Sequence, residues 1–114
     1  MRVLFVDDDA DIRSLYSQFL CEHGYDVSVA VDGQDALEML ERNNDFGAII
    51  IDRQMPRMTG DEFVTKVRYS GYPIILHSGC SLGVDRIHGL FAFVLKGHDA
   101  KGDLLSALEC IEHG

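Results

Sequence analysis

The sequence predicts an α/β fold in which a five-stranded parallel sheet carries helices on both faces. Strand-like apolar runs and helix-like periodic segments alternate five times from one end of the chain to the other. The apolar runs lack the polar alternation of a half-exposed strand, which is typical of strands buried in a parallel sheet. At 114 residues, with 46% hydrophobic and 25% charged residues, the chain suits one soluble globular core.

The first half of the chain predicts three strands and two helices. The strands are expected at residues 3–6, 27–31 and 48–51, where apolar residues run together. The helix between the first two strands is indicated by apolar residues at intervals of three and four, and Gly24 is suited to end it. Its stripe consists of Ile12, Leu15, Tyr16, Phe19 and Leu20, and a weaker stripe of Ala36, Leu37 and Leu40 follows the turn at Asp32-Gly33.

The second half predicts two further strands and three helices. The strands are expected at residues 73–76 and 91–95. Thr59 and Glu62 have the spacing of a capping box, which starts a helix that is expected to end near Gly71. The other two helices are expected at residues 84–90, where the pattern is weak, and on a stripe formed by Leu104, Leu105, Leu108 and Ile111.

Charge, cysteine content and the length of the apolar runs narrow the class of protein. Acidic residues outnumber basic ones by 19 to 10, which gives a formal net charge of −9 and disfavours direct binding to nucleic acid. The three cysteines lack zinc-site or CxxC spacing, so we interpret them as reduced thiols. The sequence shows no signal peptide and no membrane-spanning run. We therefore expect a single cytoplasmic domain over residues 1–114, without a linker and without attachment to a membrane.

Polar side chains follow four of the predicted strands at the point where each strand ends. Ligands of doubly wound sheets bind beyond the carboxyl ends of the strands, so these side chains are expected to meet. Carboxylates held about 4 Å apart repel by roughly 4 kcal/mol at an effective dielectric of about 20, and a divalent cation relieves that repulsion. Mg²⁺ is the predicted cofactor because it prefers oxygen ligands and bridges carboxylates to phosphate. The residues are Asp7 and Asp8 after the first strand, Asp52 after the third, Ser78 after the fourth and Lys96 after the fifth.

The same residue types suit the transfer of a phosphoryl group to a carboxylate. That chemistry depends on positioning and on neutralising the charge of the phosphoryl oxygens. A metal ion would neutralise one oxygen, the ammonium of Lys96 a second, and the hydroxyl of Ser78 would contact the third. Asp52 then remains as the carboxylate that attacks phosphorus. A merely structural ionic cluster is the alternative interpretation, but it does not explain why four strand ends converge.

Four segments of the chain together resemble the receiver domain of two-component response regulators. They are VDDDADIR, DRQMPRMTG, PIILHSG and FVLKG, and the resemblance covers essentially the whole chain. It implies a CheY-like, flavodoxin-like sheet with the strand order 2-1-3-4-5. It also implies that Asp52 is the phosphorylated residue and a metal ligand, and that Asp7 and Asp8 are the acidic pair that holds Mg²⁺.

The resemblance assigns roles to four further residues by their positions in these segments. Gln54 matches the residue whose backbone carbonyl binds the metal. Ser78 matches the hydroxyl residue that turns toward the phosphoryl group, and Lys96 matches the lysine that pairs with it; both are implied to assist catalysis. Phe93, three residues before Lys96, matches the aromatic switch residue, and Ser78 is implied to act in the same switch.

The resemblance implies a signalling phosphoprotein rather than an enzyme with a separate substrate. A sensor histidine kinase or a phosphotransfer protein would donate the phosphoryl group, as in a phosphorelay, and the chain would catalyse only its own phosphorylation and dephosphorylation. A conformational change would then signal to a downstream effector. The alternative is a degenerate receiver that binds a partner protein without being phosphorylated.

Several departures from the family pattern motivate that alternative. Gly97 follows Lys96, where the family usually has proline. The intervals from Asp52 to Ser78 and from Ser78 to Lys96 are each about one helical turn short of what the family leads us to expect. The third and fourth helices are therefore expected to be short.

Two other classes of protein are disfavoured by the residues that follow the third and the first predicted strands. A haloacid dehalogenase also forms an aspartyl phosphate, but it needs a second aspartate at the position of Gln54. A flavodoxin-like carrier needs a loop rich in hydroxyl groups and glycine after the first strand, where this chain has DDDAD.

Overall fold

Five parallel strands form one sheet in the order β2-β1-β3-β4-β5, which confirms the predicted strand order. The computed structural model describes all residues from 1 to 114. The bounds of the strands are β1 (Arg2–Val6), β2 (Asp26–Ala30), β3 (Ala48–Ile51), β4 (Ile74–Ser78) and β5 (Ala92–Leu95). Each lies within two residues of its predicted range.

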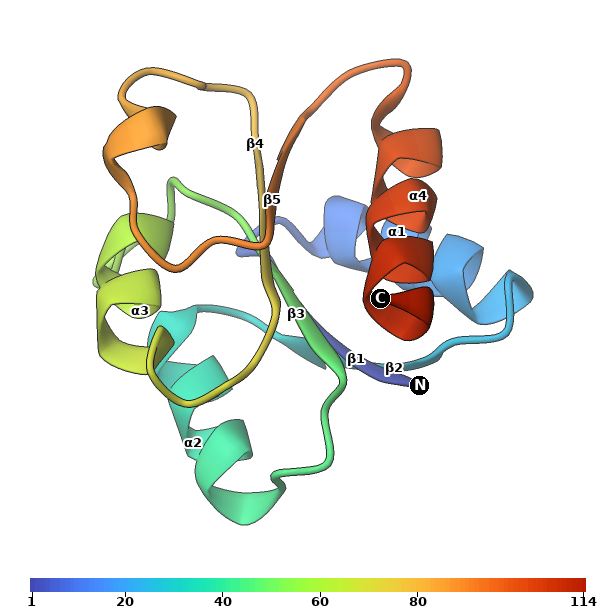
Figure 1. Cartoon of the computed structure of the whole chain (residues 1–114), viewed down its shortest axis with the longest axis horizontal. Coiled ribbons are helices and arrows are strands. Elements are labelled where there is room, and N and C mark those ends of the chain that lie inside the picture. The colour runs from blue at the N-terminus through green and yellow to red at the C-terminus, as the bar shows by residue number, and fades with distance from the viewer.

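Helices cover both faces of the sheet, as Figure 1 shows. One face carries α1 (Ala10–Glu22) and α4 (Ala100–His113), and the opposite face carries α2 (Gly33–Arg42) and α3 (Gly60–Val67). This arrangement confirms the predicted doubly wound fold. No helix combines the length and the hydrophobicity that a membrane crossing requires.

Each face of the sheet has its own buried core, because successive side chains of a strand point to opposite faces. Along β1, Leu4 and Val6 pack beneath α2 and α3, whereas Val3 and Phe5 pack beneath α1 and α4. All four side chains are almost completely buried. The continuous apolar run that predicted this strand therefore reflects burial on both faces.

Side-chain caps fix where α1 and α3 begin. Asp9 is the N-cap of α1, and its carboxylate accepts hydrogen bonds from the backbone N–H groups of Asp11 and Ile12. At the start of α3, Thr59 and Glu62 form the predicted capping box, in which each side chain bonds the other residue's backbone. Such caps satisfy N–H groups that have no partner inside the helix.

The helix predicted at residues 84–90 is wrong in extent. The structure has only a single 3₁₀ turn there, η1 (Val84–Arg86). Gly83 precedes the turn with a φ of 69° and Gly89 follows it with a φ of 98°, and both angles are incompatible with a continuing α-helix. With eight residues in α3 and three in η1, both segments are short, as the intervals between the sequence motifs predicted.

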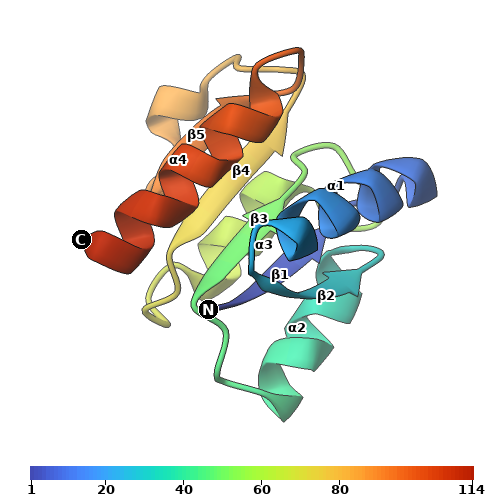
Figure 2. The same ribbon diagram turned by 90° about the vertical axis from the view of Figure 1, so that its right-hand side faces the viewer.

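The register of the strands brings their carboxyl ends to one edge of the sheet. Val6 of β1 pairs with Ile51 of β3, and Ser78 of β4 pairs with Leu95 of β5. Residues that directly follow these strands therefore emerge side by side. The loops that carry them lie together at the end of the sheet where α1 begins, as the side view in Figure 2 shows.

One histidine lies inside the core. His77 of β4 is 1% exposed and lies on the α1 and α4 face of the sheet, where its ring packs against Tyr16 and Phe5 at centroid distances of 5.0 and 6.3 Å. Neither ring nitrogen has a hydrogen-bond partner in the protein. Burial, aided by the nearby Lys96 ammonium, lowers the pKa of His77 from 6.5 to about 4, so the ring is neutral at physiological pH.

Candidate functional site

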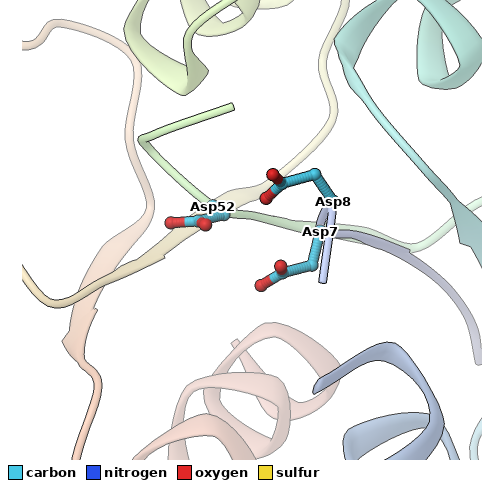
Figure 3. A group of neighbouring side chains, drawn as sticks. All are labelled: Asp7, Asp8 and Asp52. Carbon is cyan, nitrogen blue, oxygen red and sulfur yellow. The ribbon is translucent and has the colours of Figure 1, made fainter. Parts of the chain in front are cut away.

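Three carboxylates meet at the carboxyl end of the sheet. Asp7 and Asp8 directly follow β1, and Asp52 directly follows β3. One oxygen from each residue can be chosen so that all three lie within 4.8 Å of one another. Figure 3 shows the side chains of Asp7 and Asp8 both extending from the end of β1 toward Asp52. The structure thus brings together the three acidic residues that the sequence singled out.

Two of these carboxylates are buried and the third is exposed. Asp7 and Asp52 are 1% and 7% exposed, whereas Asp8 is open to solvent. One oxygen of Asp7 accepts a hydrogen bond of 2.9 Å from the backbone N–H of Asp9, and the backbone N–H of Gln54 donates to Asp52 at 3.4 Å. The backbone that continues each strand therefore holds the carboxylate in place.

Lys96 extends from the end of β5 to bridge the two buried carboxylates. Its Nζ lies 3.3 Å from Oδ2 of Asp7 and 3.2 Å from Oδ2 of Asp52. Burial disfavours the charged ammonium, but the charges of Asp52 and Asp7 outweigh that effect and raise the pKa of Lys96 above 10.5. Lys96 is therefore a permanent cation in the cluster. Asp52 and Asp7 precede it in the sequence by 44 and 89 positions.

The cluster keeps an excess of negative charge that suits a hard cation. Three carboxylates face one ammonium, and a carboxylate has acceptor oxygens beyond those that Lys96 contacts. Burial raises the pKa of Asp7 above 3.8, the charge of Asp52 adds to the rise, and the Asp9 N–H and the Lys96 ammonium only partly oppose it. An all-oxygen donor set with uncompensated charge is what Mg²⁺ or Ca²⁺ binds.

Replacing Asp7 with asparagine should stabilise the metal-free protein at neutral pH. We expect Asp7→Asn to raise the free energy of unfolding by about 1 kcal/mol, because the amide removes a buried anion that the fold disfavours. A carboxyl group whose pKa is raised by folding contributes stability only while it is protonated. The advantage of the variant should therefore shrink as the pH falls through the raised pKa of Asp7.

Urea denaturation of both proteins as a function of pH measures this difference. Asp11→Asn is the matched control, because Asp11 is exposed at the start of α1, outside the cluster. A variant that is less stable than the wild type in chelator at neutral pH would contradict the prediction.

The other predicted site residues lie on β4, on β5 and in the loop after Asp52. Ser78 is 2% exposed at the end of β4, and its hydroxyl oxygen accepts a hydrogen bond of 3.3 Å from the backbone N–H of Cys80. Gln54 lies in the loop after Asp52. Phe93 is half-buried on β5 and packs against the core beneath α2 and α3. The roles of Ser78, Gln54 and Phe93 stay predictions.

Sequence reasoning missed Arg53, which directly follows Asp52. Its guanidinium donates to both carboxylate oxygens of Asp61, at 2.9 and 3.1 Å, and to the backbone carbonyl of Cys80 at 3.1 Å. The signal in the sequence was a basic residue directly beside Asp52, in the loop that follows an apolar strand. Its partners were not predictable, because Cys80 is 27 residues away.

The fold and the site define a class: a doubly wound α/β domain with an acidic, lysine-bridged site at the carboxyl ends of its strands. Comparison with known proteins narrows that class. Residues 3–108 match the family model described as the response regulator receiver domain. The chain belongs to the response regulator receiver domain family, which confirms the resemblance noted from the sequence.

Curated relatives include regulators from several bacteria. The chain is 37% identical over 94 residues to the response regulator MprA of Mycobacterium leprae, a match that covers 81% of this chain and 41% of that protein. It is 32% identical over 90 residues to the transcriptional regulatory protein CpxR homolog of Haemophilus influenzae, with coverage of 78% and 39%. The chain therefore spans about two-fifths of the length of the curated relatives it matches.

Solved structures match almost the whole chain. The chemotaxis protein CheY4 of Vibrio cholerae aligns with a TM-score of 0.85 at 32% identity, and the match covers 96% of this chain and 97% of that one. The response regulator TrrA of Thermotoga maritima, solved in complex with Mg²⁺ and BeF, aligns with a TM-score of 0.89 at 26% identity and the same coverage. These likenesses confirm the CheY-like fold.

Proposed function

We propose that this chain is a phosphoacceptor that takes a phosphoryl group onto Asp52 in a Mg²⁺-dependent reaction. The donor would be the phosphohistidine of a sensor histidine kinase or of a phosphotransfer protein. An oxygen of Asp52 forms a bond to phosphorus while the bond between phosphorus and the donor nitrogen breaks. The observation that carries this proposal is the convergence of Asp7, Asp8 and Asp52 with Lys96 at one edge of the sheet.

Each residue of the cluster has a task in this reaction. The carboxylates of Asp7, Asp8 and Asp52, with the backbone carbonyl of Gln54, would hold Mg²⁺, which neutralises charge on the phosphoryl group. Lys96 already contacts Asp52, so its ammonium is placed to stabilise a phosphoryl oxygen on that side chain. The solved complex of TrrA with Mg²⁺ and BeF, in a protein 26% identical to this chain, shows that a receiver of the same fold binds both groups.

Phosphorylation would act as a switch between two packings of the domain. The new dianion on Asp52 would attract the hydroxyl of Ser78, and Phe93 on the neighbouring strand would change its packing in response. The altered surface would then be recognised by an effector protein, or by a further segment of a longer protein. The chain would be no enzyme beyond catalysing its own phosphorylation and dephosphorylation, and we place it in the cytoplasm, where sensor kinases present their phosphohistidines.

Incubation with acetyl phosphate and Mg²⁺ tests the proposal. We expect the intact mass to increase by one phosphoryl group, and we expect no increase when EDTA replaces Mg²⁺, because the repulsion between the carboxylates is then uncompensated. Absence of any increase in the presence of Mg²⁺ would contradict the proposal. Measurable Mg²⁺ binding without phosphoryl uptake would instead favour a degenerate receiver that binds its partner without phosphorylation.

A further inference from the structure

Arg53 joins two segments that flank the phosphoacceptor site. Its side chain is largely buried, and it forms a two-pronged ion pair with Asp61 in the first turn of α3. Its remaining terminal nitrogen donates to the backbone carbonyl of Cys80, in the loop between β4 and η1. A planar guanidinium can serve both partners at once, whereas an ammonium provides a single point charge.

The Cys80 backbone is held from both sides. Its carbonyl accepts from Arg53 at 3.1 Å, and its N–H donates to the hydroxyl oxygen of Ser78 at 3.3 Å. A chain of hydrogen bonds therefore runs from Asp61 through Arg53 and Cys80 to Ser78. The Ser78 hydroxyl oxygen is occupied by this loop while the loop stays in its present position.

We propose that Arg53 is a positioning residue that holds the loop after β4, and through it the hydroxyl of Ser78, in the resting arrangement. This inference rests on the proposed function, in which Ser78 turns toward a phosphoryl group on Asp52. For that turn the hydroxyl must leave the Cys80 N–H, or the loop must move with it. The bond from Arg53 to Cys80 opposes movement of the loop, and the bond from the Cys80 N–H opposes departure of the hydroxyl, so this chain of contacts favours the unphosphorylated state.

The first test measures phosphorylation with the full chain. We expect Arg53→Met to increase the rate of phosphoryl uptake from limiting acetyl phosphate by about fivefold, because a contact that stabilises only the resting state is lost. Arg86→Met is the matched control: it removes the same charge from the nearby turn η1, where Arg86 is exposed, and it should leave the rate unchanged. If the wild type is labelled and Arg53→Met equals Arg86→Met, the role of Arg53 is refuted while the proposed function stands.

The second test measures how often the loop after β4 opens, from the reactivity of the Cys80 thiol. With the exposed Cys21 and Cys110 replaced by serine, Cys80 is the only thiol, and its rate of alkylation reports opening of the loop. We expect Arg53→Met to raise this rate about fivefold, and Arg53→Lys to raise it similarly, because lysine can pair with Asp61 but cannot also hold the Cys80 carbonyl.

Two further measurements support this alkylation assay: a check that each variant folds, and a comparison of the protein before and after phosphorylation. Thermal unfolding identifies any variant that fails to fold. Asp61→Asn then serves as a second variant, because it removes the ion pair that anchors Arg53 to α3. Phosphorylation of the single-thiol protein that retains Arg53 should also raise the alkylation rate of Cys80, since it moves the loop away from Arg53. Unchanged Cys80 reactivity in folded Arg53→Met or Asp61→Asn protein would overturn the inference, even if phosphorylation proceeds normally.

Discussion

Phosphoryl uptake from acetyl phosphate is expected to disappear when Asp52 is replaced by asparagine. The amide has nearly the same shape as the carboxylate but is a far weaker nucleophile, so the bond to phosphorus does not form. The substitution also removes one of the three carboxylates and one of the two partners of Lys96. Mg²⁺ should therefore bind more weakly to the variant. Intact-mass measurement against the wild type checks the first effect, and titration with Mg²⁺ checks the second.

The fold should survive this substitution, which keeps the experiment interpretable. Asp52 is buried, and exchanging it for asparagine relieves repulsion within the cluster while Lys96 retains Asp7 as a partner. Asp11→Asn, which removes an exposed carboxylate close by in sequence to Asp7 and Asp8, should be labelled like the wild type. A phosphoryl group that persists in Asp52→Asn protein would show that another residue accepts it and that the assignment is wrong.

Replacing His77 with leucine should remove a loss of about 3 kcal/mol in the free energy of unfolding that the wild type undergoes between neutral and acidic pH. The pKa of His77 is about 4 in the fold, because burial disfavours the charged ring, and its ordinary value is 6.5. Between these values the unfolded chain binds a proton that the folded protein rejects. The wild type therefore loses stability as the pH falls from 6.5 toward 4, at about 1.4 kcal/mol per pH unit, whereas the variant lacks this loss.

The variant should also be slightly more stable at neutral pH, since leucine removes two buried ring nitrogens that have no partner. Urea denaturation at neutral and acidic pH measures both effects as differences from the wild type. His88→Gln is the control, because His88 is exposed in the loop after η1 and should show no such difference. A difference between the wild type and His77→Leu that stays constant with pH would mean that His77 is not buried as the structure shows.

The hydrophobic pattern and the local motifs were enough to predict most of the fold and the acidic part of the site. The buried strands read as uninterrupted apolar runs because both of their faces are covered, and the caps of α3 follow from contacts three residues apart. Asp7, Asp8, Asp52 and Lys96 could be found because each follows a strand, and parallel strands end at one edge. The predicted convergence needed only the order of elements along the chain.

The segment after β4 shows where such reasoning failed. A weak apolar pattern at residues 84–90 predicted a helix, but Gly83 and Gly89 take up left-handed conformations and leave a single 3₁₀ turn. Propensity is a weak guide in so short a segment, because packing of a few side chains against the core outweighs it. Val84 and Ile87 make that packing here.

The sequence by itself determined the alternation of strands and helices, the acidic residues at the strand ends and membership of the receiver family. Only the tertiary structure decided that Lys96 spans two carboxylates, that Arg53 ties Asp61 to Cys80, and that His77 lies without hydrogen-bond partners in the core. The physical reason is the range of the interactions. Periodicity and caps arise within a few residues, whereas each of these contacts joins side chains that become neighbours only after the sheet has formed.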